Sequence, residues 1–497
     1  MSHESTATAP TAATTGDYAV LKWLVGATFI VILNETIIIN AVPRLQAQFD
    51  VSQRAAGWLT TGFMLTMAVV IPITGWFLQR VTTRQAFALA MTVFAAGTLL
   101  AAVAPVFWVL LAARIVQAAG TAVMMPLLMT TLMNVVPESD RGRVMGNVTM
   151  AISVAPALGP ATSGIVLQYF SWRWIFLFVL PLAVLITVAG LRRLGNVGEP
   201  TAGSVDVVSV VVSALGFGSL VYGLSQIGAP DQSVAPGWLI GAGVLVLAVF
   251  VWRQLVLQRS DRPLLDLRAF THRTFALSLL LMAVAFMAFL SVLFLLPQYL
   301  QEARHLSTLK TGLLLIPGGL AMGLLGPRVG ALYDRFGGRP LVIPGSIGIF
   351  VSLVLFTRVD LGTPYAVVMA MHILMMVSLA LVFTPVFTLG LGALPQNLYS
   401  HGSSLLGALQ QVAGAAGAAV SVAVLSSRAT DLKAAGATAE SAFAGGMERA
   451  FVVGAAISLV VVAVAVILPG RLPAPADDTW ENRDEIDLDD DGVVVPA

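Results

Sequence analysis

The 497-residue sequence contains no cysteine and only three lysines. The absence of cysteine excludes disulfide bonds and thiolate metal sites. None of the lysines lies in a glycine-rich phosphate-binding loop, so an ATP-driven pump is disfavoured. Charged residues make up 11% of the chain, whereas ordinary globular domains have about 25%. The net charge of +1 gives no indication of a nucleic-acid partner.

Hydrophobic residues, in contrast, make up 57% of the chain, and its mean hydropathy is +0.88. Apolar runs of about twenty residues recur along nearly the whole length, and a helix of that length crosses a bilayer. A soluble core cannot bury so much apolar surface, whereas lipid is itself an apolar solvent. The sequence therefore predicts an all-α polytopic membrane protein with about fourteen transmembrane helices, at residues 20–43, 56–79, 85–104, 107–135, 144–169, 172–194, 205–226, 237–258, 272–298, 310–334, 339–357, 364–390, 402–426 and 448–469.

The ends of the chain and the loops predict an orientation. Residues 1–19 are expected to form a disordered tail rather than a signal peptide, and residues 470–497 an acidic, solvated tail. Residues 487–492 match only the opening of a calcium-binding loop, which we dismiss because its twelfth position would fall past the last residue. Arginine is more frequent in the loops on the side of the termini. The positive-inside rule therefore places both termini in the cytoplasm, and we expect a bacterial inner membrane.

Two of these loops repeat one pattern. Residues 75–84 (GWFLQRVTTR) and 330–339 (GALYDRFGGR) both have glycine, a polar residue and arginine four and five positions later, and another arginine after four more. The repeat pairs the second predicted helix with the tenth, and parallel repeats of this kind relate the halves of one class of transporters. We therefore predict six-helix bundles at 20–194 and 272–469, an inserted helix pair at 205–258, and a pocket between the bundles.

Several short motifs occur in order along these helices: LNET at 33–36 with AVP at 41–43, RIVQAAG at 114–120, ALGPATSG at 157–164, SWRWIF at 171–176 and GALYDRFGGR at 330–339. Together they resemble the motifs of the major facilitator superfamily, specifically its fourteen-helix drug:proton antiporter branch. The resemblance implies the major facilitator fold. It also implies that Gly159, Pro160 and Gly164 form the antiporter motif, which is associated with export and lets helices approach closely and bend.

The chain departs from the family pattern at several positions. Gln79 stands where the family has aspartate in the first loop, and glycines of the motifs are replaced by Thr82, Ala118 and Ser163. In the first helix the family's aspartate position is Asn34, and Glu35 follows it directly. Lincomycin-type efflux pumps of this branch have a similar Asn-Glu-Thr run, which leads to the hypothesis that Glu35 takes over the carboxylate role.

Glu35 is the one acidic residue that we place deep inside a predicted helix. A charge at bilayer depth costs about 2.5–3.5 kcal/mol on insertion scales, so such residues usually pair or function. A proton-coupled transporter needs a carboxylate of this kind, and Arg114 on the fourth predicted helix is the matching cation. We predict that Glu35, Arg114 and Asn34 carry proton coupling. The alternative is a static pair of Glu35 with Arg114 that joins two helices.

The repeated loops suggest a gate at the cytoplasmic face. Their charged residues are expected to meet helix ends that separate when the two halves rock, and the neutral Gln79 makes the first contact the weaker one. The alternative is that these arginines only determine topology. The predicted gating residues are Arg80, Arg84, Asp334, Arg335 and Arg339.

Methionines and aromatic residues within the helices suit an adaptable apolar pocket. Each of them can equally face lipid or pack in the core, and the glutamines can bind substrate or a facing helix. The predicted substrate-binding residues are Phe63, Met67, Gln117, Met124, Phe286, Phe289 and Gln410.

The predicted function is proton-coupled export of small lipophilic compounds by alternating access. A dedicated exporter of a self-made metabolite or an envelope lipid is an alternative, because a broad apolar pocket serves it as well. A membrane-embedded enzyme is the alternative of another class, but no G-x-S-x-G or H-E-x-x-H motif occurs. We expect no cofactor and no metal site, since His372 has no partner at metal-ligand spacing. The expected partners are the substrate, protons and the lipid bilayer, and we expect a monomer.

Overall fold

The computed structural model describes residues 17–197, 200–201, 205–227, 235–260 and 262–471. The predicted terminal tails therefore lie almost entirely outside the described residues. Within the described part there is no β-strand. The α-helices are α1 (Asp17–Ile37), α2 (Val42–Phe49), α3 (Gln53–Leu78), α4 (Thr83–Ala102), α5 (Phe107–Val135), α6 (Arg141–Tyr169), α7 (Arg173–Arg193), α8 (Val207–Ser225), α9 (Pro236–Leu257), α10 (Arg273–Gln298), α11 (Thr308–Phe336), α12 (Arg339–Phe356), α13 (Tyr365–Gly392), α14 (Tyr399–Ala434) and α15 (Ala439–Ile467). Short helical turns are η1 (Ile39–Ala41), η2 (Glu138–Asp140), η3 (Gln258–Ser260), η4 (Leu267–Thr271), η5 (Tyr299–Ala303) and η6 (Gln396–Leu398).

The helix count agrees with the prediction. Apart from α2, which has 8 residues, the fourteen described α-helices each have 18 or more. Among the described residues, thirteen candidate membrane spans are long and apolar enough to cross a bilayer, and α6 is the long helix that is not among them. The all-α polytopic membrane architecture is thereby confirmed. Some boundaries were wrong: the first span ends at Ile37 instead of residue 43, and α14 has 36 residues where residues 402–426 were expected.

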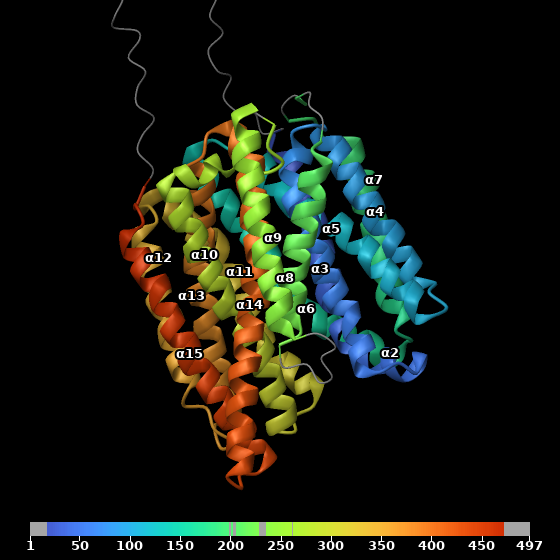
Figure 1. Cartoon of the computed structure of the whole chain (residues 1–497), viewed down its shortest axis with the longest axis vertical. Coiled ribbons are helices and arrows are strands. Elements are labelled where there is room, and N and C mark those ends of the chain that lie inside the picture. The colour runs from blue at the N-terminus through green and yellow to red at the C-terminus, as the bar shows by residue number, and fades with distance from the viewer. Residues whose placement is uncertain (1–16, 198–199, 202–204, 228–234, 261, 472–497) are drawn as a thin grey trace, which may run out of the picture.

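The long helices form two groups of six. Helices α1 and α3–α7 pack with one another as the N-terminal half, and α10–α15 pack as the C-terminal half (Figure 1). The two halves meet mainly through α6 against α11 and α3 against α14. These two contacts are equivalent, because α3 and α11 carry the repeated loop and α6 and α14 are the fifth long-helix positions of their halves. The described chain begins and ends at the same end of the bundle, which we call the terminal end; the opposite end is the distal end.

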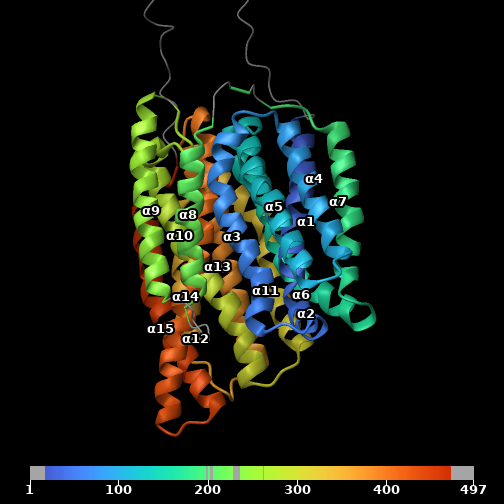
Figure 2. The same ribbon diagram turned by 45° about the vertical axis from the view of Figure 1, so that its right-hand side comes forward.

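Helices α8 and α9 stand outside both halves. They pack closely on each other, and α8 also contacts α3 and α14, so it covers the seam between the halves (Figure 2). A methyl group added at Gly243 of α9 would meet the backbone of Leu220 in α8. At the start of α8, Asp206 accepts hydrogen bonds from Arg253 Nε at 2.7 Å and Nη2 at 2.8 Å. These bonds lower the pKa of Asp206 to about 2, so the pair stays ionised at physiological pH.

Candidate functional site

A cavity of about 280 Å³ lies between the two halves. Four helices of each half line it, namely α1, α3, α5 and α6 and their counterparts α10, α11, α13 and α14. Its wall is largely apolar, with many flexible methionines and a group of aromatic rings. The ring centroids of Phe286 and Phe289 are 5.7 Å apart, and Phe383 lies 6.3 and 6.4 Å from them. Such a wall can adapt to apolar compounds of different shapes.

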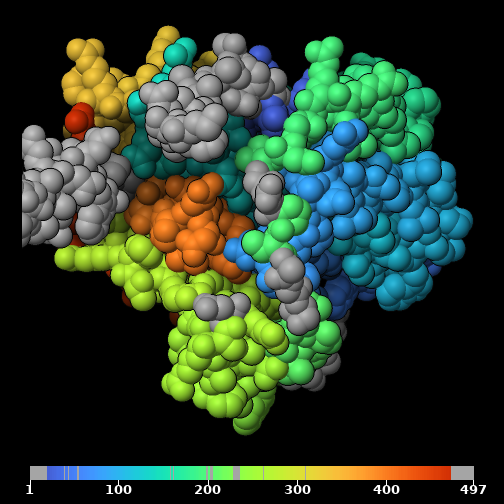
Figure 3. Space-filling view, turned by 90° about the horizontal axis from the view of Figure 1, so that it is seen from above, coloured from blue at the N-terminus to red at the C-terminus, as the bar shows by residue number. Residues whose placement is uncertain are grey.

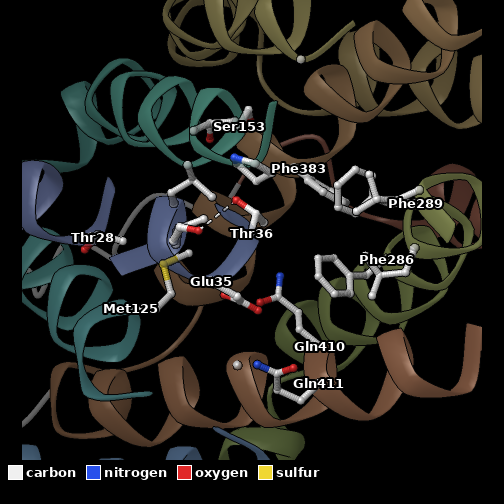
Figure 4. Close-up of a pocket in the computed structure, with 18 of the residues that line it drawn as sticks. Thr28, Glu35, Thr36, Met125, Ser153, Phe286, Phe289, Phe383, Gln410 and Gln411 are labelled. Carbon is white, nitrogen blue, oxygen red and sulfur yellow. Dashed lines mark hydrogen bonds between the residues drawn. The ribbon is translucent and has the colours of Figure 1, made fainter. Parts of the chain in front are cut away.

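Glu35 lies in this cavity. It is half-buried on α1, and its side chain points toward Gln410 of α14 on the opposite half (Figure 4). Within the described part of the chain, no hydrogen bond or ion pair is recorded for its carboxylate. Glu35 and His372 are the titratable side chains among the described residues that line the cavity. The carboxyl group therefore lies against the cavity rather than inside a network of protein contacts.

Arg114 lies beside this site but is held by other residues. Its Nη1 donates to Asn34 Oδ1 at 3.1 Å and to Gln117 Oε1 at 3.0 Å, and its guanidinium lies 4.2 Å from the ring centroid of Phe63. The side chain is fully buried, and these neutral acceptors bind Nη1 without neutralising the positive charge. Arg114 and Glu35 interact electrostatically but form no direct ion pair. The alternative of a static ion pair between these two residues is therefore not seen in this arrangement.

The terminal end of the two halves is joined by polar contacts. Asp334 at the end of α11 accepts the backbone N–H groups of Gly142 and Arg143 in the first turn of α6, both at 2.8 Å. A carboxylate at a helix N-terminus is favoured because unpaired N–H groups carry partial positive charge there. At the equivalent place in the other seam, Gln79 donates to the carbonyl of Asn397 at 3.0 Å. The amide thus makes one neutral contact where the carboxylate makes two charge-assisted ones.

Hydroxyl pairs join α14 to the N-terminal half nearby. Thr74 and Ser404 are 2.8 Å apart, and Thr130 and Ser403 are 3.0 Å apart. Seen from the terminal end, the first turns of α14 lie between α6 and the segment that connects α3 and α4 (Figure 3). The halves are therefore in contact at this end of the cavity. The other predicted gating residues stay within their own half or its linker: Arg80 donates to Thr201, the backbone N–H of Arg84 to Asn196, and Arg339 to Leu468, while Arg335 lies over Phe336.

Glycines allow α6 and α11 to touch along their backbones. Gly142 and Gly146 of α6 face Gly330 and Gly326 of α11, and a methyl group on any of the four would overlap backbone of the other helix. Both pairs have the small-x-x-x-small spacing that permits close helix contact in membranes. Sequence analysis missed this seam, although the spacing was there to find it.

Comparison with known proteins identifies the family. The profile described as Major Facilitator Superfamily matches residues 24–418. The chain belongs to the major facilitator superfamily. Superfamily members are transporters, which sets aside the enzyme alternative.

Curated relatives within the superfamily span most of the chain. The lincomycin resistance protein LmrB of Listeria monocytogenes is 38% identical over 399 residues, which are 80% of this chain and 84% of the relative. The MFS-type transporter YcnB of Bacillus subtilis is 38% identical over 439 residues, covering 88% and 92%. The "putative multidrug resistance protein MdtD" of Klebsiella pneumoniae is 30% identical over 404 residues, which are 80% of this chain and 84% of the relative.

Solved structures confirm the superfamily fold. The human organic anion transporter MFSD10 matches with a TM-score of 0.65 at 14% identity, over 90% of this chain and 99% of that one. The proton:xylose symporter XylE matches with a TM-score of 0.63 at 15% identity, over 92% and 97%. At these identities the likeness concerns the fold alone.

Against this superfamily fold, the predicted substrate residues divide into two groups. Met67, Phe286, Phe289 and Gln410 line the cavity, as expected of substrate contacts. Three others do not line it in this arrangement. Phe63 lies under the Arg114 guanidinium, Gln117 bonds to Arg114 and Thr98, and Met124 is fully buried in the N-terminal half. Residues missed by sequence analysis include Thr28, which shares one face of α1 with Glu35 at a spacing of seven.

The two glycines of the antiporter motif have different surroundings. A methyl group at Gly159 would overlap the Thr36 hydroxyl of α1, so this glycine does permit close approach. Gly164 has no atom near the position of an added methyl group, so the expected close contact is not made there. The side chain of Pro160 lies outside the described part of the chain.

We predict that replacing Asp334 with asparagine loosens the terminal end. The amide keeps one acceptor oxygen but loses the charge that faces the α6 N-terminus, and a loss of about 1.4 kcal/mol would change the ratio of closed to open forms about tenfold. Because the chain has no native cysteine, spin labels on Ser139→Cys and Pro340→Cys report the separation of the halves directly. Asp360→Asn, in a distal loop where the carboxylate bonds only its own loop, is the matched control. Unchanged distances in D334N would contradict the gating role.

Proposed function

We propose that this protein is a proton-coupled exporter of small lipophilic compounds that works by alternating access. The observation that carries the proposal is Glu35, an acidic side chain without a recorded hydrogen bond that faces a mostly apolar cavity between two six-helix halves. We further propose that it lies in the bacterial inner membrane with both termini in the cytoplasm, as the arginine distribution favours. The relatives named for lincomycin and multidrug resistance support export of such compounds.

In this proposal the described arrangement is the state closed toward the cytoplasm. The Asp334 contact, the Gln79 contact and the hydroxyl pairs hold the terminal end together, and the cavity reaches Gly312 in the first turns of α11 on the distal side. Glu35 then receives a proton from outside, where the proton concentration is higher. Opposite rocking of the halves, with α8 and α9 as an inserted pair outside them, would bring Glu35 to the cytoplasmic side. There it releases the proton and the cavity accepts the next substrate molecule.

The arrangement of Arg114 suits this cycle. Its positive charge is held in place by Asn34 and Gln117, so it stays beside Glu35 whether or not Glu35 carries a proton. A carboxylate paired directly with arginine would give up its affinity for protons and remain locked. Electrostatic contact without a direct bond keeps the carboxylate stable in the membrane and still available for exchange.

Purified protein in liposomes with a pH-sensitive dye inside tests the proposal. Lincomycin and tetraphenylphosphonium are the probes, and an imposed proton gradient is expected to drive their uptake, with proton movement in the opposite direction. A protonophore should abolish the accumulation. Accumulation that ignores both the gradient and the protonophore would overturn proton coupling. If neither compound moves protons, but a metabolite and lipid extract of the cells that naturally make this protein does, the dedicated exporter is favoured instead.

A further inference from the structure

Three residues that line the cavity each carry a polar atom with no hydrogen-bond partner among the described residues. The atoms are Thr28 Oγ1 on α1, Ser153 Oγ on α6 and His372 Nδ1 on α13. All three atoms are buried, and their residues come from both halves. A buried polar atom without a partner destabilises the fold, and native structures keep such atoms mostly where they serve a purpose.

Other hydroxyl groups in the same wall are satisfied within the protein. Thr121 donates to the carbonyl of Gln117 at 3.0 Å, and Thr36 to the carbonyl of Leu33 at 3.2 Å. Thr149 accepts from Thr384 at 3.0 Å. Serine and threonine in helices usually make such bonds to their own turn. The hydroxyl groups of Thr28 and Ser153, which make no such bond, therefore differ from the other hydroxyl groups of the wall.

The imidazole of His372 is fixed with one nitrogen unused. It is hydrogen bonded to the backbone of Leu315, and its ring lies against Gly318, where an added methyl group would come within 2.8 Å of Nε2. A neutral imidazole that donates from one nitrogen presents the other as an acceptor. Nδ1 is thus suited to accept a hydrogen bond from a hydroxyl or N–H group.

Phe286 and Phe289 belong to α10, whereas the three unpartnered atoms belong to α1, α6 and α13. In Figure 4, Phe286 and Phe289 lie to the right of Glu35 and Thr36, Thr28 lies to the left, and Ser153 lies above Thr36. A ligand that packs on the rings and also pairs with these polar atoms has an apolar body and several hydrogen-bonding groups. A purely apolar compound would leave the three polar atoms unsatisfied.

We propose that the exported compounds are amphiphiles whose hydroxyl, amide or amine groups pair with Thr28, Ser153 and His372 while their apolar body packs on Phe286 and Phe289. The proposal deepens the export function proposed above and rests on it for the direction of transport. It assigns the recognition of substrate to these three polar residues, separately from the proton site at Glu35.

Binding to purified protein in lipid nanodiscs tests the assignment. Lincomycin carries several hydroxyl groups and an amide, whereas tetraphenylphosphonium has no hydrogen-bonding group. Thr28→Val and Ser153→Ala remove one hydroxyl each with little change of shape. Each is expected to raise the Kd for lincomycin about tenfold, as the loss of one such bond implies, and to leave the Kd for tetraphenylphosphonium unchanged. His372→Phe, which keeps a ring, is expected to act in the same way.

Thr121→Val is the matched control, because its hydroxyl also lies in the wall but bonds within its own helix. It should change neither Kd, and unaltered tetraphenylphosphonium binding shows that each variant is folded. An equal loss for both compounds, no loss for either, or failure of the wild type to bind lincomycin would overturn the proposal. If lincomycin binds with the expected selectivity but moves no protons in liposomes, the proposed antiport fails and the assignment of the three polar residues stands.

Discussion

Replacing Glu35 with glutamine is expected to reduce substrate-driven proton movement to the background of empty liposomes. Glutamine has nearly the same shape but cannot take up or release a proton in the relevant pH range. The residue lines the cavity, and no hydrogen bond or ion pair of its carboxylate is recorded within the described chain. The substitution therefore removes the proposed proton carrier without removing a contact that holds the fold together.

The surroundings of Glu35 make this test selective. Arg114 is anchored by Asn34, Gln117 and Phe63, so E35Q leaves all its recorded bonds in place. We expect tetraphenylphosphonium still to bind, and any remaining flux to be independent of the proton gradient. Glu302→Gln, an exposed acid at the distal end, is the control and should transport like the wild type.

The measurement is proton release from the liposome lumen on addition of substrate, with insertion and amount of each variant matched. Proton exchange in E35Q at the rate of the wild type would show that Glu35 is structural. The proton path would then have to pass through another group, and His372 is the remaining titratable side chain among the described residues of the cavity wall.

The fold was largely predictable from the sequence because the bilayer imposes its own length on each helix. Runs of apolar residues marked the spans, and the repeated loop fixed which helices correspond. The residues at which the helices begin and end were less predictable. α14 and α15 continue past the predicted spans toward the distal end, where alanine, serine and charged residues such as Arg428 and Lys433 keep forming helix without being apolar (Figure 1). Hydrophobicity alone does not indicate where a helix ends once it has left the membrane.

The site was predictable only in part. Glu35 stands out in any reading because an acid in an apolar run is rare. Phe63 and Met67 share one face of α3 by spacing, but Phe63 turns onto Arg114, which depends on a tertiary contact. Whether a threonine bonds to its own turn, as Thr121 does, or is left free, as Thr28 is, depends on a side-chain rotamer that sequence does not encode.

Replacing Gly330 of α11 with alanine is expected to prevent the terminal end from closing as it does in this structure. The added methyl group would overlap the carbonyl of Gly142, and it would also come within 3.0 Å of Arg143 Cα. Both are backbone atoms, which cannot rotate away as a side chain can, so α6 and α11 must separate. The effect should exceed that of D334N, which only removes attraction.

The same spin labels on Ser139→Cys and Pro340→Cys measure this separation, and liposome transport measures its consequence. We expect a longer distance between the halves in G330A and loss of most transport. Alanine favours helix over glycine by about 1 kcal/mol, so a weaker helix cannot explain the loss. Gly164→Ala is the matched control, because that glycine lies in α6 with open space around the added methyl group. Unaltered distances and transport in G330A would mean that the seam does not need backbone contact, and that the polar contacts of Asp334 and α14 close the terminal end by themselves.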